Sequence, residues 1–275
     1  MISVLILTKN EEQDLPGCLQ SVDWCDDVHV FDSYSTDATV KIATEAGANI
    51  TQRVFDNWSA HQNWGLQNIT FKYPWILYID ADERVSEGLR DALLSFDPTK
   101  INAVACEIQR RDFAWNGTWL KHAQISPFYL RFFRPSKMRY ERLVNPVSIP
   151  DGPVAKIDGY LDHYPFSKGF RYWVQRHLGY ADMEAAMRMD DISKGVVFSW
   201  KKALFSEKRY HQKGLFYKMP GRPIFKWFYM IIWRRAFLDG KAGITYASLQ
   251  SIYEYFIVLK TKEQLHKIKK GKKRV

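Results

Sequence analysis

The chain has 275 residues, 46% of them hydrophobic, and a formal net charge of +10, which allows one large domain or one domain with an appendage. The longest aromatic and aliphatic run, residues 227–233, is far shorter than the about 20 residues that cross a bilayer, and residues 1–20 predict no secretory leader. The three cysteines form no CxxC pair, which argues against a disulfide framework or a zinc site and fits a reducing cytosol.

Alternating strand and helix patterns fill the first third of the chain. The strands are short apolar runs, and the helices carry apolar residues at helical spacing. In chain order we expect a strand over residues 2–7, a helix over 12–22, a strand over 28–32, a helix from about residue 40 to Gly47, a strand over 49–54, a helix over 58–69 and a strand over 75–79. This β-α alternation predicts a parallel, Rossmann-like sheet.

Three of these strands end in polar residues, namely residues 8–11, Asp32 and residues 80–83. Open α/β sheets bind ligands at the carboxyl ends of their strands, so we expect a binding site there. Asp80 and Asp82 are two residues apart and share a side in extended chain. Two close carboxylates suit a divalent metal that also takes phosphate oxygens. The alternative is an acidic turn that leads into a helix N-terminus, where acids are favoured.

The glycine-rich loops that bind phosphate in other nucleotide-binding proteins are missing. After the first strand there is neither a G-x-G-x-x-G nor a G-x-x-x-x-G-K-[ST] sequence. This argues against a dinucleotide-dependent dehydrogenase or a P-loop enzyme, and phosphate would be held by a metal instead.

Three segments together carry a family resemblance. They are residues 4–12 (VLILTKNEE), 31–37 (FDSYSTD) and 77–83 (LYIDADE). In this order and spacing they resemble the family 2 glycosyltransferases, which have the GT-A fold. Residues 130–134, 162–164 and 237–240 resemble the bacterial lipopolysaccharide-core and exopolysaccharide branch of that family.

The resemblance implies an α/β fold of the GT-A type over residues 1–165, with a Rossmann-like, mostly parallel sheet and flanking helices. It implies inverting, metal-dependent transfer of a hexose from a nucleotide-sugar donor, for which we expect a UDP-sugar. A bound divalent ion would act as a Lewis acid and stabilise the charge of the departing nucleoside diphosphate.

The resemblance also assigns roles to matching positions. Residues that would bind the nucleoside are Thr8, Asn10, Glu11 and Asp32. Asp32 would accept a hydrogen bond from the ring N–H of the base, as expected for uracil. Asp80 would lie by the ribose and the waters of the metal, and Asp82 would bind Mg²⁺ or Mn²⁺ at the diphosphate.

The general base is less well defined. An inverting transferase needs a carboxylate, or less often a histidine, to accept the proton of the acceptor hydroxyl. Members of the related branch carry its glutamate in a V-H-E or V-N-E motif, but this chain has Pro146 at that position. The nearest carboxylate is Glu141, and Asp112 and His163 are further candidates. Glu141 lies between two arginines, so a surface ion pair is the alternative for it.

Acidic and basic residues are distributed unevenly along the chain. Residues 1–100 contain 7 Lys and Arg against 16 Asp and Glu, whereas residues 101–275 contain 33 against 14. The first part therefore predicts a domain with an acidic site, and the remainder predicts a surface that meets anions such as phosphates, nucleic acid or anionic lipid.

Residues 166–275 predict a helical, basic and membrane-associating region. Helical spacing indicates helices over residues 169–192 and 244–260, and residues 267–274 are almost entirely charged. Basic helices with interleaved Trp, Phe and Tyr are typical of the interface of anionic membranes. A second interpretation is nucleic-acid binding, but no such module is recognisable, so we expect no nucleic acid. A third is aromatic packing on the catalytic domain or in a homo-oligomer.

These features predict transfer to a lipid-linked or lipopolysaccharide glycan in bacterial cell-envelope synthesis. The protein would be cytoplasmic and peripheral on the inner face of the cytoplasmic membrane. Two alternatives belong to other classes. A sugar-phosphate nucleotidyltransferase would carry a G-x-G-[ST]-R-like loop where this chain has residues 8–11, TKNE. A membrane- or nucleic-acid-binding protein with a relic site would show no turnover.

Overall fold

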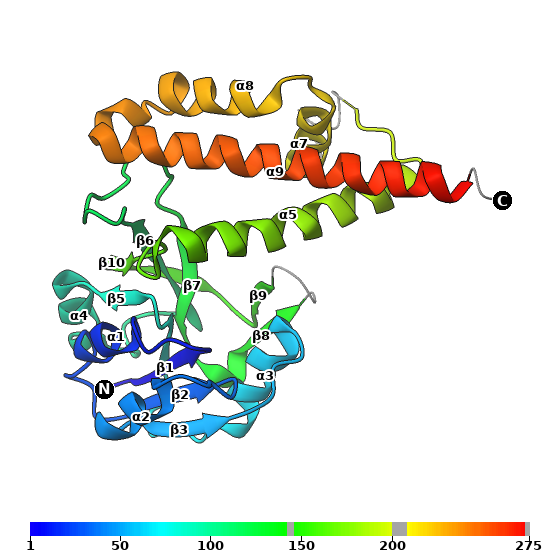
Figure 1. The fold of residues 1–275 in the computed structure, drawn as a ribbon. Helices are drawn as coiled ribbons and strands as arrows, with labels where there is room; N and C mark the ends of the chain where they lie inside the picture. Colours follow the sequence, from blue (N-terminus) through cyan, green and yellow to red (C-terminus); the bar gives the residue numbers. More distant parts are fainter. Residues whose placement is uncertain (142–145, 200–207, 273–275) are drawn as a thin grey trace. The chain divides into compact units, whose positions relative to one another are not determined.

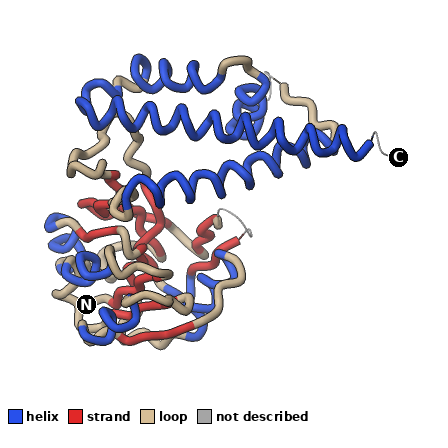
Figure 2. Tube along the Cα trace, viewed as in Figure 1, coloured by secondary structure: helices blue, strands red, loops and turns tan. Residues whose placement is uncertain are grey.

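The computed structural model describes residues 1–141, 146–199 and 208–272 (Figures 1 and 2). The chain divides into two compact units. Unit 1 comprises Met1–Trp115 and Ser126–Ser167, and unit 2 comprises Asn116–Ile125 and Lys168–Val275. The sequence suggests a domain boundary after residue 165, and this boundary stays a proposal. It assigns residues 116–125 to the N-terminal domain, whereas the structure groups them with unit 2.

Unit 1 contains an eight-stranded sheet of order β3-β2-β1-β4-β7-β6-β10-β5. Its strands are β1 (Ser3–Thr8), β2 (Val28–Asp32), β3 (Asn49–Gln52), β4 (Ile76–Asp80), β5 (Glu83–Val85), β6 (Ala105–Asp112), β7 (Phe128–Phe133) and β10 (Val154–His163). Its helices are α1 (Leu15–Gln20), α2 (Thr39–Glu45), α3 (Trp58–Asn68), α4 (Glu87–Leu94) and the short η1 (Pro135–Lys137). A separate two-stranded sheet pairs β8 (Met138–Glu141) with β9 (Val147–Pro150).

The sheet is mostly parallel, as predicted, and β1 to β4 follow the predicted β-α alternation. β1 pairs in parallel with both β2 and β4, and β6 pairs in parallel with β10. β7 and β5 run antiparallel to their neighbours, which makes the sheet mixed. The sequence analysis did not predict β5, β8, β9 or β10. Glu83 therefore lies in a strand and not in the first turn of a helix.

The core lies on both faces of the sheet. All six residues of β1 are buried, as expected for a central strand covered on both sides. Leu15, Cys18 and Leu89 of α1 and α4 pack on one face, and β8 and the partly buried Trp64 of α3 pack on the other. The N-cap residue of α3 is Asn57, whose side-chain oxygen accepts a hydrogen bond from the backbone N–H of Ala60 at 2.9 Å.

Unit 2 is helical, and Figure 2 shows no strand among its described residues. Its elements are α5 (Gly169–Ser193), α7 (Lys208–Lys218), α8 (Arg222–Phe228), the π-helical η2 (Tyr229–Trp233), η3 (Ala236–Asp239) and α9 (Gly240–Lys272). α5 and α8 both pack against α9 (Figure 1). The predicted helix over residues 169–192 is confirmed. The one predicted over 244–260 extends further at both ends, so the basic segment continues α9 up to Lys272.

The helices can be examined for segments that could cross a membrane. Over residues 1–141, 146–199 and 208–272, no helix combines the length and the apolar character needed to cross a bilayer.

Candidate functional site

The loops that follow β1 and β2 are tied to each other. The Thr8 hydroxyl donates a hydrogen bond to Asp32 Oδ1 at 2.9 Å, and Asn10 Oδ1 accepts one from the backbone N–H of Thr36 at 2.8 Å. Asn10 has the left-handed backbone angle φ 55°, and Tyr34 has φ 57°. The structure therefore brings Thr8, Asn10 and Asp32 together at the carboxyl ends of two neighbouring strands.

Asp32 is buried, and hydrogen-bond donors surround its carboxylate. Oδ2 accepts hydrogen bonds from the Ser35 backbone N–H and from Gln52 Nε2, each at 2.9 Å. Oδ1 accepts from the hydroxyls of Thr8 and Ser35. Burial alone would raise the pKa of Asp32, but the hydrogen bonds from Ser35 and Gln52 lower it below its usual value. Asp32 thus links the ends of β1, β2 and β3, and its contact with a base stays a prediction.

Glu11 lies next to this pair of loops and is half-buried. Its backbone N–H donates a hydrogen bond to the Thr39 hydroxyl at 2.7 Å, which joins the β1 loop to the start of α2. The proposed ribose contact of Glu11 stays a prediction.

Asp80 ends β4 beside a buried arginine. Arg131 Nη2 lies 2.6 Å from Asp80 Oδ2 and 3.1 Å from Glu83 Oε1. The Glu83 side chain is fully buried, and its Oε2 accepts a hydrogen bond from the Asp80 backbone N–H at 3.0 Å. Burial raises the pKa of the Glu83 carboxyl more than the neighbouring Arg131 lowers it. Arg131 therefore holds two carboxylates in fixed positions at the end of β4.

Asp82, His163 and Asp112 form a second line of contacts. His163 Nε2 lies 3.2 Å from Asp82 Oδ2, and His163 Nδ1 contacts Asp112 Oδ1. Arg110 Nε lies 3.2 Å from the same Asp112 oxygen. Burial opposes a charge on His163, but Asp82 and Asp112 outweigh it and raise the pKa of His163 to about 9. Asp112, a candidate base, is thus paired with two partners in the interior.

The four acids of this region differ in depth. The side chains of Asp80 and Asp82 are 38% and 21% exposed, whereas Glu83 and Asp112 are 0% and 1% exposed. Asp80 and Asp82 are therefore accessible at the sheet edge, whereas Glu83 and Asp112 lie in the interior. This separation makes Asp80 and Asp82 the acids that a ligand can reach.

The exposed pair suits a metal that arrives with a phosphate ligand. Among the described residues, no group of three or more His, Cys, Asp or Glu side chains is placed to hold an ion. Asp80 and Asp82 would therefore supply at most two protein ligands. That number fits Mg²⁺ or Mn²⁺, which are commonly bound by one or two carboxylates together with substrate phosphates and water.

Glu141 is the last residue of β8, in the separate two-stranded sheet. Its side chain is 56% exposed and pairs with Arg139 at 3.1 Å. The neighbouring Tyr140 points to the opposite side of the strand and is buried, with its ring 6.0 Å from that of Tyr78. Pro146 is described, but the preceding residues 144 and 145 of the motif lie outside the described residues. The role of Glu141 as base stays a prediction.

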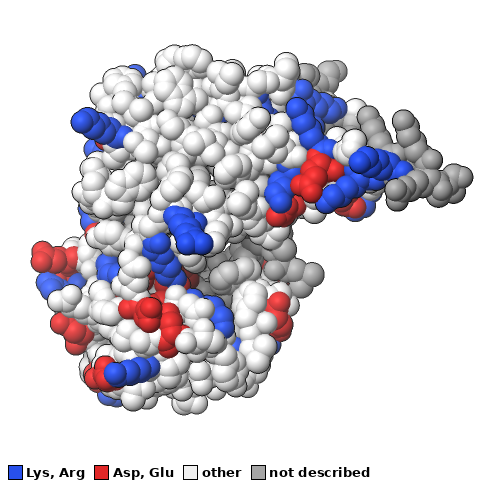
Figure 3. All heavy atoms as spheres, viewed as in Figure 1, with Lys and Arg blue, Asp and Glu red and all other residues white. Residues whose placement is uncertain are grey.

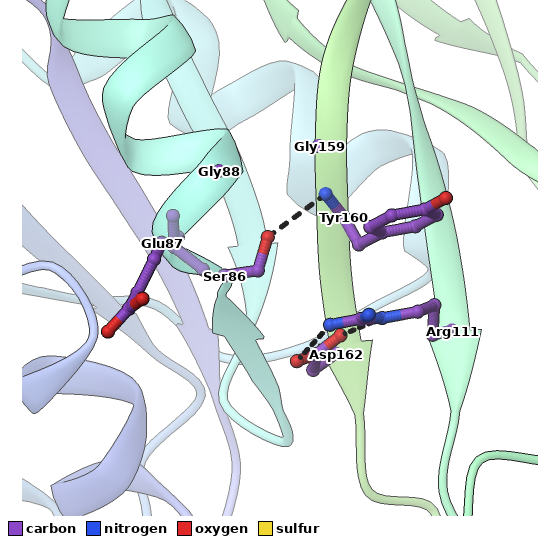
Figure 4. A pocket seen from close by; sticks show the side chains of 8 residues that line it. Ser86, Glu87, Gly88, Arg111, Gly159, Tyr160 and Asp162 are labelled. Carbon is purple, nitrogen blue, oxygen red and sulfur yellow. Dashed lines mark hydrogen bonds and ion pairs between the residues drawn. The ribbon is translucent and has the colours of Figure 1, made fainter.

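A cavity of about 520 Å³ opens on the opposite face of β6 and β10 (Figure 4). Arg111 Nε lies 2.6 Å from Asp162 Oδ1 there, and the Tyr160 backbone N–H donates a hydrogen bond to Ser86 Oγ at 3.1 Å. Arg111 and Asp162 are register partners, directly before the pair Asp112 and His163. Because neighbouring side chains alternate across a sheet, this cavity and the acid cluster face opposite sides.

Sequence reasoning missed the cations of the site. Arg131 interrupts an apolar strand, and a buried charge needs a partner, so the sequence FYLRFF did carry a signal. Arg110 offered no comparable signal. The sequence analysis placed Glu83 among the acids at the end of β4 but linked neither Arg110 nor Arg131 to the site.

Residues 3–158 match the model of the family described as glycosyl transferase family 2. The chain belongs to glycosyl transferase family 2. The resemblance seen in the sequence is thereby confirmed.

Two curated relatives extend the match. The chain is 27% identical over 172 residues to a lipopolysaccharide core biosynthesis glycosyltransferase of Rhizobium meliloti, covering 59% of this chain and 63% of that protein. It is 38% identical over 93 residues to an uncharacterized glycosyltransferase of Rickettsia bellii, covering 34% of this chain and 31% of that protein. The chain thus spans less than two thirds of either relative.

A solved structure of similar fold is a mannosyltransferase from Pyrobaculum calidifontis in complex with GDP-Man and Mn²⁺. The TM-score is 0.52 at 15% sequence identity, over 94% of this chain and 86% of that one. At this identity the likeness shows the fold alone. It confirms the predicted GT-A fold with a helical C-terminal region.

Proposed function

We propose that this glycosyltransferase moves a sugar from a nucleoside diphosphate donor to an acceptor hydroxyl, with inversion at the anomeric carbon. The observation that carries the proposal is the exposed pair Asp80 and Asp82 at the carboxyl end of β4. The pair lies on the same sheet edge as the tied loops after β1 and β2. Open α/β sheets bind ligands at such an edge.

Asp82, with Asp80 beside it, would hold Mg²⁺ or Mn²⁺ against the donor diphosphate. The bound ion would stabilise the negative charge of the departing nucleoside diphosphate. Arg131 fixes Oδ2 of Asp80, and His163 fixes Oδ2 of Asp82, so both carboxylates are oriented before the donor binds. Such preorganisation lowers the reorganisation needed in the transition state.

The nucleoside would bind along Thr8, Asn10 and Glu11, with the base near Asp32. We propose a UDP-sugar because a carboxylate acceptor suits the N–H of uracil. The structurally similar mannosyltransferase is in complex with GDP-Man, so a guanine nucleotide is the first competitor to test.

For the general base we propose Glu141, with Asp112 and His163 as the other candidates. Glu141 is an exposed carboxylate that an acceptor hydroxyl can reach, and it pairs with Arg139 at 3.1 Å. Asp112 is less accessible because its Oδ1 is taken by Arg110 and His163.

The acceptor we propose is a lipid-linked or lipopolysaccharide glycan at the inner face of the cytoplasmic membrane, where the protein would be peripheral. Two observations support this location. One relative is named for lipopolysaccharide core biosynthesis, and residues 101–275 carry 33 basic against 14 acidic residues. The other partners would be the nucleotide-sugar and an anionic membrane surface, and a homo-oligomer stays open.

Calorimetric titration of the protein with UDP, GDP, CDP and ADP, with and without Mn²⁺, tests the donor site. We expect Mn²⁺-dependent binding of one nucleotide, UDP, and loss of that dependence in Asp82→Asn. The matched control Asp23→Asn alters an exposed acid outside the site and should bind like the wild type. Mn²⁺-dependent affinity that survives in Asp82→Asn would remove the metal assignment, and no binding of any nucleotide would contradict the proposed function.

A further inference from the structure

Unit 2 carries a row of large apolar side chains on its surface. α8 and η2 follow each other without a break from Arg222 to Trp233. Six residues of this segment are between 41% and 79% exposed, namely Ile224, Phe225, Phe228, Tyr229, Ile232 and Trp233. We call these six residues the apolar stripe.

The apolar stripe has helical periodicity. Residues 224, 228 and 232 are four apart, as are residues 225, 229 and 233, so all six share one side of the helical segment. Phe237 and Leu238 of η3, which are 50% and 53% exposed, follow directly in the chain. A helix on a protein surface normally turns its apolar side inward, and this segment does the reverse.

The other side of the same segment is bound to α9. Trp227 Nε1 donates a hydrogen bond to Ser248 Oγ at 3.1 Å, and Ser251 Oγ donates one to the Pro223 carbonyl at 2.7 Å. Met230 is buried. Because α9 already holds this side, the apolar stripe is the outward side of a fixed helix. An exposed apolar patch of this kind marks an interaction surface.

Charge around the apolar stripe is almost entirely positive. Residues 221–244 contain five Lys and Arg and one acid, Asp239. The Asp239 side chain is 3% exposed and accepts hydrogen bonds from the backbone N–H groups of His122 and Ala123. Arg222 is buried and lies 3.6 Å from Glu254. The other cations next to the stripe in the chain are Lys226, Arg234, Arg235 and Lys241, of which Arg234 also donates a hydrogen bond to the His122 carbonyl at 3.2 Å.

We propose that the apolar stripe inserts into the interface of a bilayer that contains anionic phospholipid. Trp, Tyr and Phe rings favour the headgroup level of a membrane, and flanking Lys and Arg side chains reach the phosphates. Figure 3 shows the surface over α8 as almost entirely white, neither acidic nor basic. The inference rests on the proposed membrane location of the acceptor and names the segment that makes the contact.

A second copy of the chain fits the stripe less well than a lipid surface. Two stripes face to face would bring two sets of flanking cations together without acids to pair them, and like charges repel. An anionic lipid surface supplies the opposite charge around an apolar interior. Charge complementarity therefore favours the bilayer.

The apolar stripe and the basic end of α9 are separate features. α9 runs from Gly240 to Lys272, and 33 residues at 1.5 Å each make it about 50 Å long. The stripe precedes the first turn of α9, whereas Lys267 and Lys270 lie in its last turns. Variants of one feature therefore leave the other intact.

Co-sedimentation with sucrose-loaded vesicles tests the inference on the full chain. One set of vesicles is pure phosphatidylcholine, and the other is an equimolar mixture of phosphatidylcholine and phosphatidylglycerol. The stripe variant is Ile232→Ser with Trp233→Ser, and the matched control is Ile192→Ser with Val197→Ser, which alters exposed apolar residues elsewhere in unit 2. A second stripe variant, Ile224→Ser with Phe228→Ser, repeats the test at other positions.

We expect the wild type and the control to bind the mixed vesicles with the same affinity. Both stripe variants should lose about tenfold or more in affinity. The reason is that burying two large apolar side chains contributes at least about 1.4 kcal/mol, which corresponds to a factor of ten. Unchanged binding by both stripe variants would overturn the inference. So would a stripe-dependent dimer in ultracentrifugation that binds vesicles no better than the variants do. Nucleotide titration of the same proteins separates the two proposals, since the stripe variants should bind donor normally whether or not they bind vesicles.

Discussion

Arg131 should be the residue on which the stability of the acid cluster depends most. Its guanidinium is buried and lies 2.6 Å from Asp80 Oδ2 and 3.1 Å from Glu83 Oε1. Arg131→Met keeps a similar volume but leaves the buried Glu83 without its nearest cation. Removing one partner of a buried ion pair costs about 3–5 kcal/mol. Arg110, 3.7 Å from Glu83, compensates in part, so we expect about 3 kcal/mol.

The matched control is the surface pair Arg139 and Glu141, which has the same separation of 3.1 Å but an exposed environment. Arg139→Met should lose less than about 1 kcal/mol, because exposed ion pairs contribute little. Equilibrium urea unfolding measures both variants. For a transition of this size, about 3 kcal/mol also lowers the melting temperature by roughly 6–12 °C.

A double-variant cycle checks the cause. Arg131→Met combined with Glu83→Gln also removes the buried carboxylate that lost its cation. The double variant should therefore regain part of the free energy of unfolding lost in Arg131→Met, with a coupling energy of about 1–3 kcal/mol. If Arg131→Met costs no more than Arg139→Met, or if the two substitutions at residues 131 and 83 simply add, the argument from burial is refuted.

Two further predictions concern stability. Burial and the nearby Arg53 lower the pKa of His61 from 6.5 to about 4 in the folded protein. Protons therefore bind His61 more tightly in the unfolded state, and the stability that the neutral His61 contributes is lost as the pH falls. Urea unfolding at several pH values should therefore show the advantage of the wild type over His61→Gln shrinking by about 2 kcal/mol between pH 7 and 4.5; a constant difference would contradict this. Gly159 has φ +104°, and a Cβ there would lie 2.4 Å from Leu89 Cα, so Gly159→Ala should cost about 2–4 kcal/mol in thermal unfolding. Gly88→Ala meets no atom within 4 Å and should be neutral or slightly stabilising, and equal effects of the two changes would contradict the argument.

The N-terminal half of the sheet was predictable because each element carries a local signal. β1 and β4 are short apolar runs with polar residues at their ends, and Gly47 has the positive φ of 73° expected where α2 stops. The strands that were not predicted, β5, β8, β9 and β10, carry weaker signals. β10 mixes polar, glycine and apolar residues over ten positions, since one of its faces is only partly buried. Its pairing with β6 and β5 depends on residues about 50 to 80 positions away in the chain.

The environment of residues 61–63, on the predicted helix over 58–69, could not be predicted for a similar reason. In the structure His61 and Gln62 are buried; the His61 ring stacks on Phe31 at 4.1 Å, and Gln62 Nε2 donates to the Tyr78 hydroxyl at 2.6 Å. The hydrogen-bond partners of polar residues on a helix that covers a sheet can be assigned only when the tertiary fold is known.

The candidate site shows which distinctions local sequence cannot make. Asp80, Asp82 and Glu83 stand within four positions and look alike as acids, yet their exposed fractions are 38%, 21% and 0%. The difference arises because Glu83 begins β5, which pairs with β10, and its buried side chain contacts Arg131 of β7. Arg131 thereby compensates the buried acid as well as orienting Asp80. Asp82, the acid proposed to bind the divalent cation, is oriented by His163, whose Nε2 lies 3.2 Å from its Oδ2.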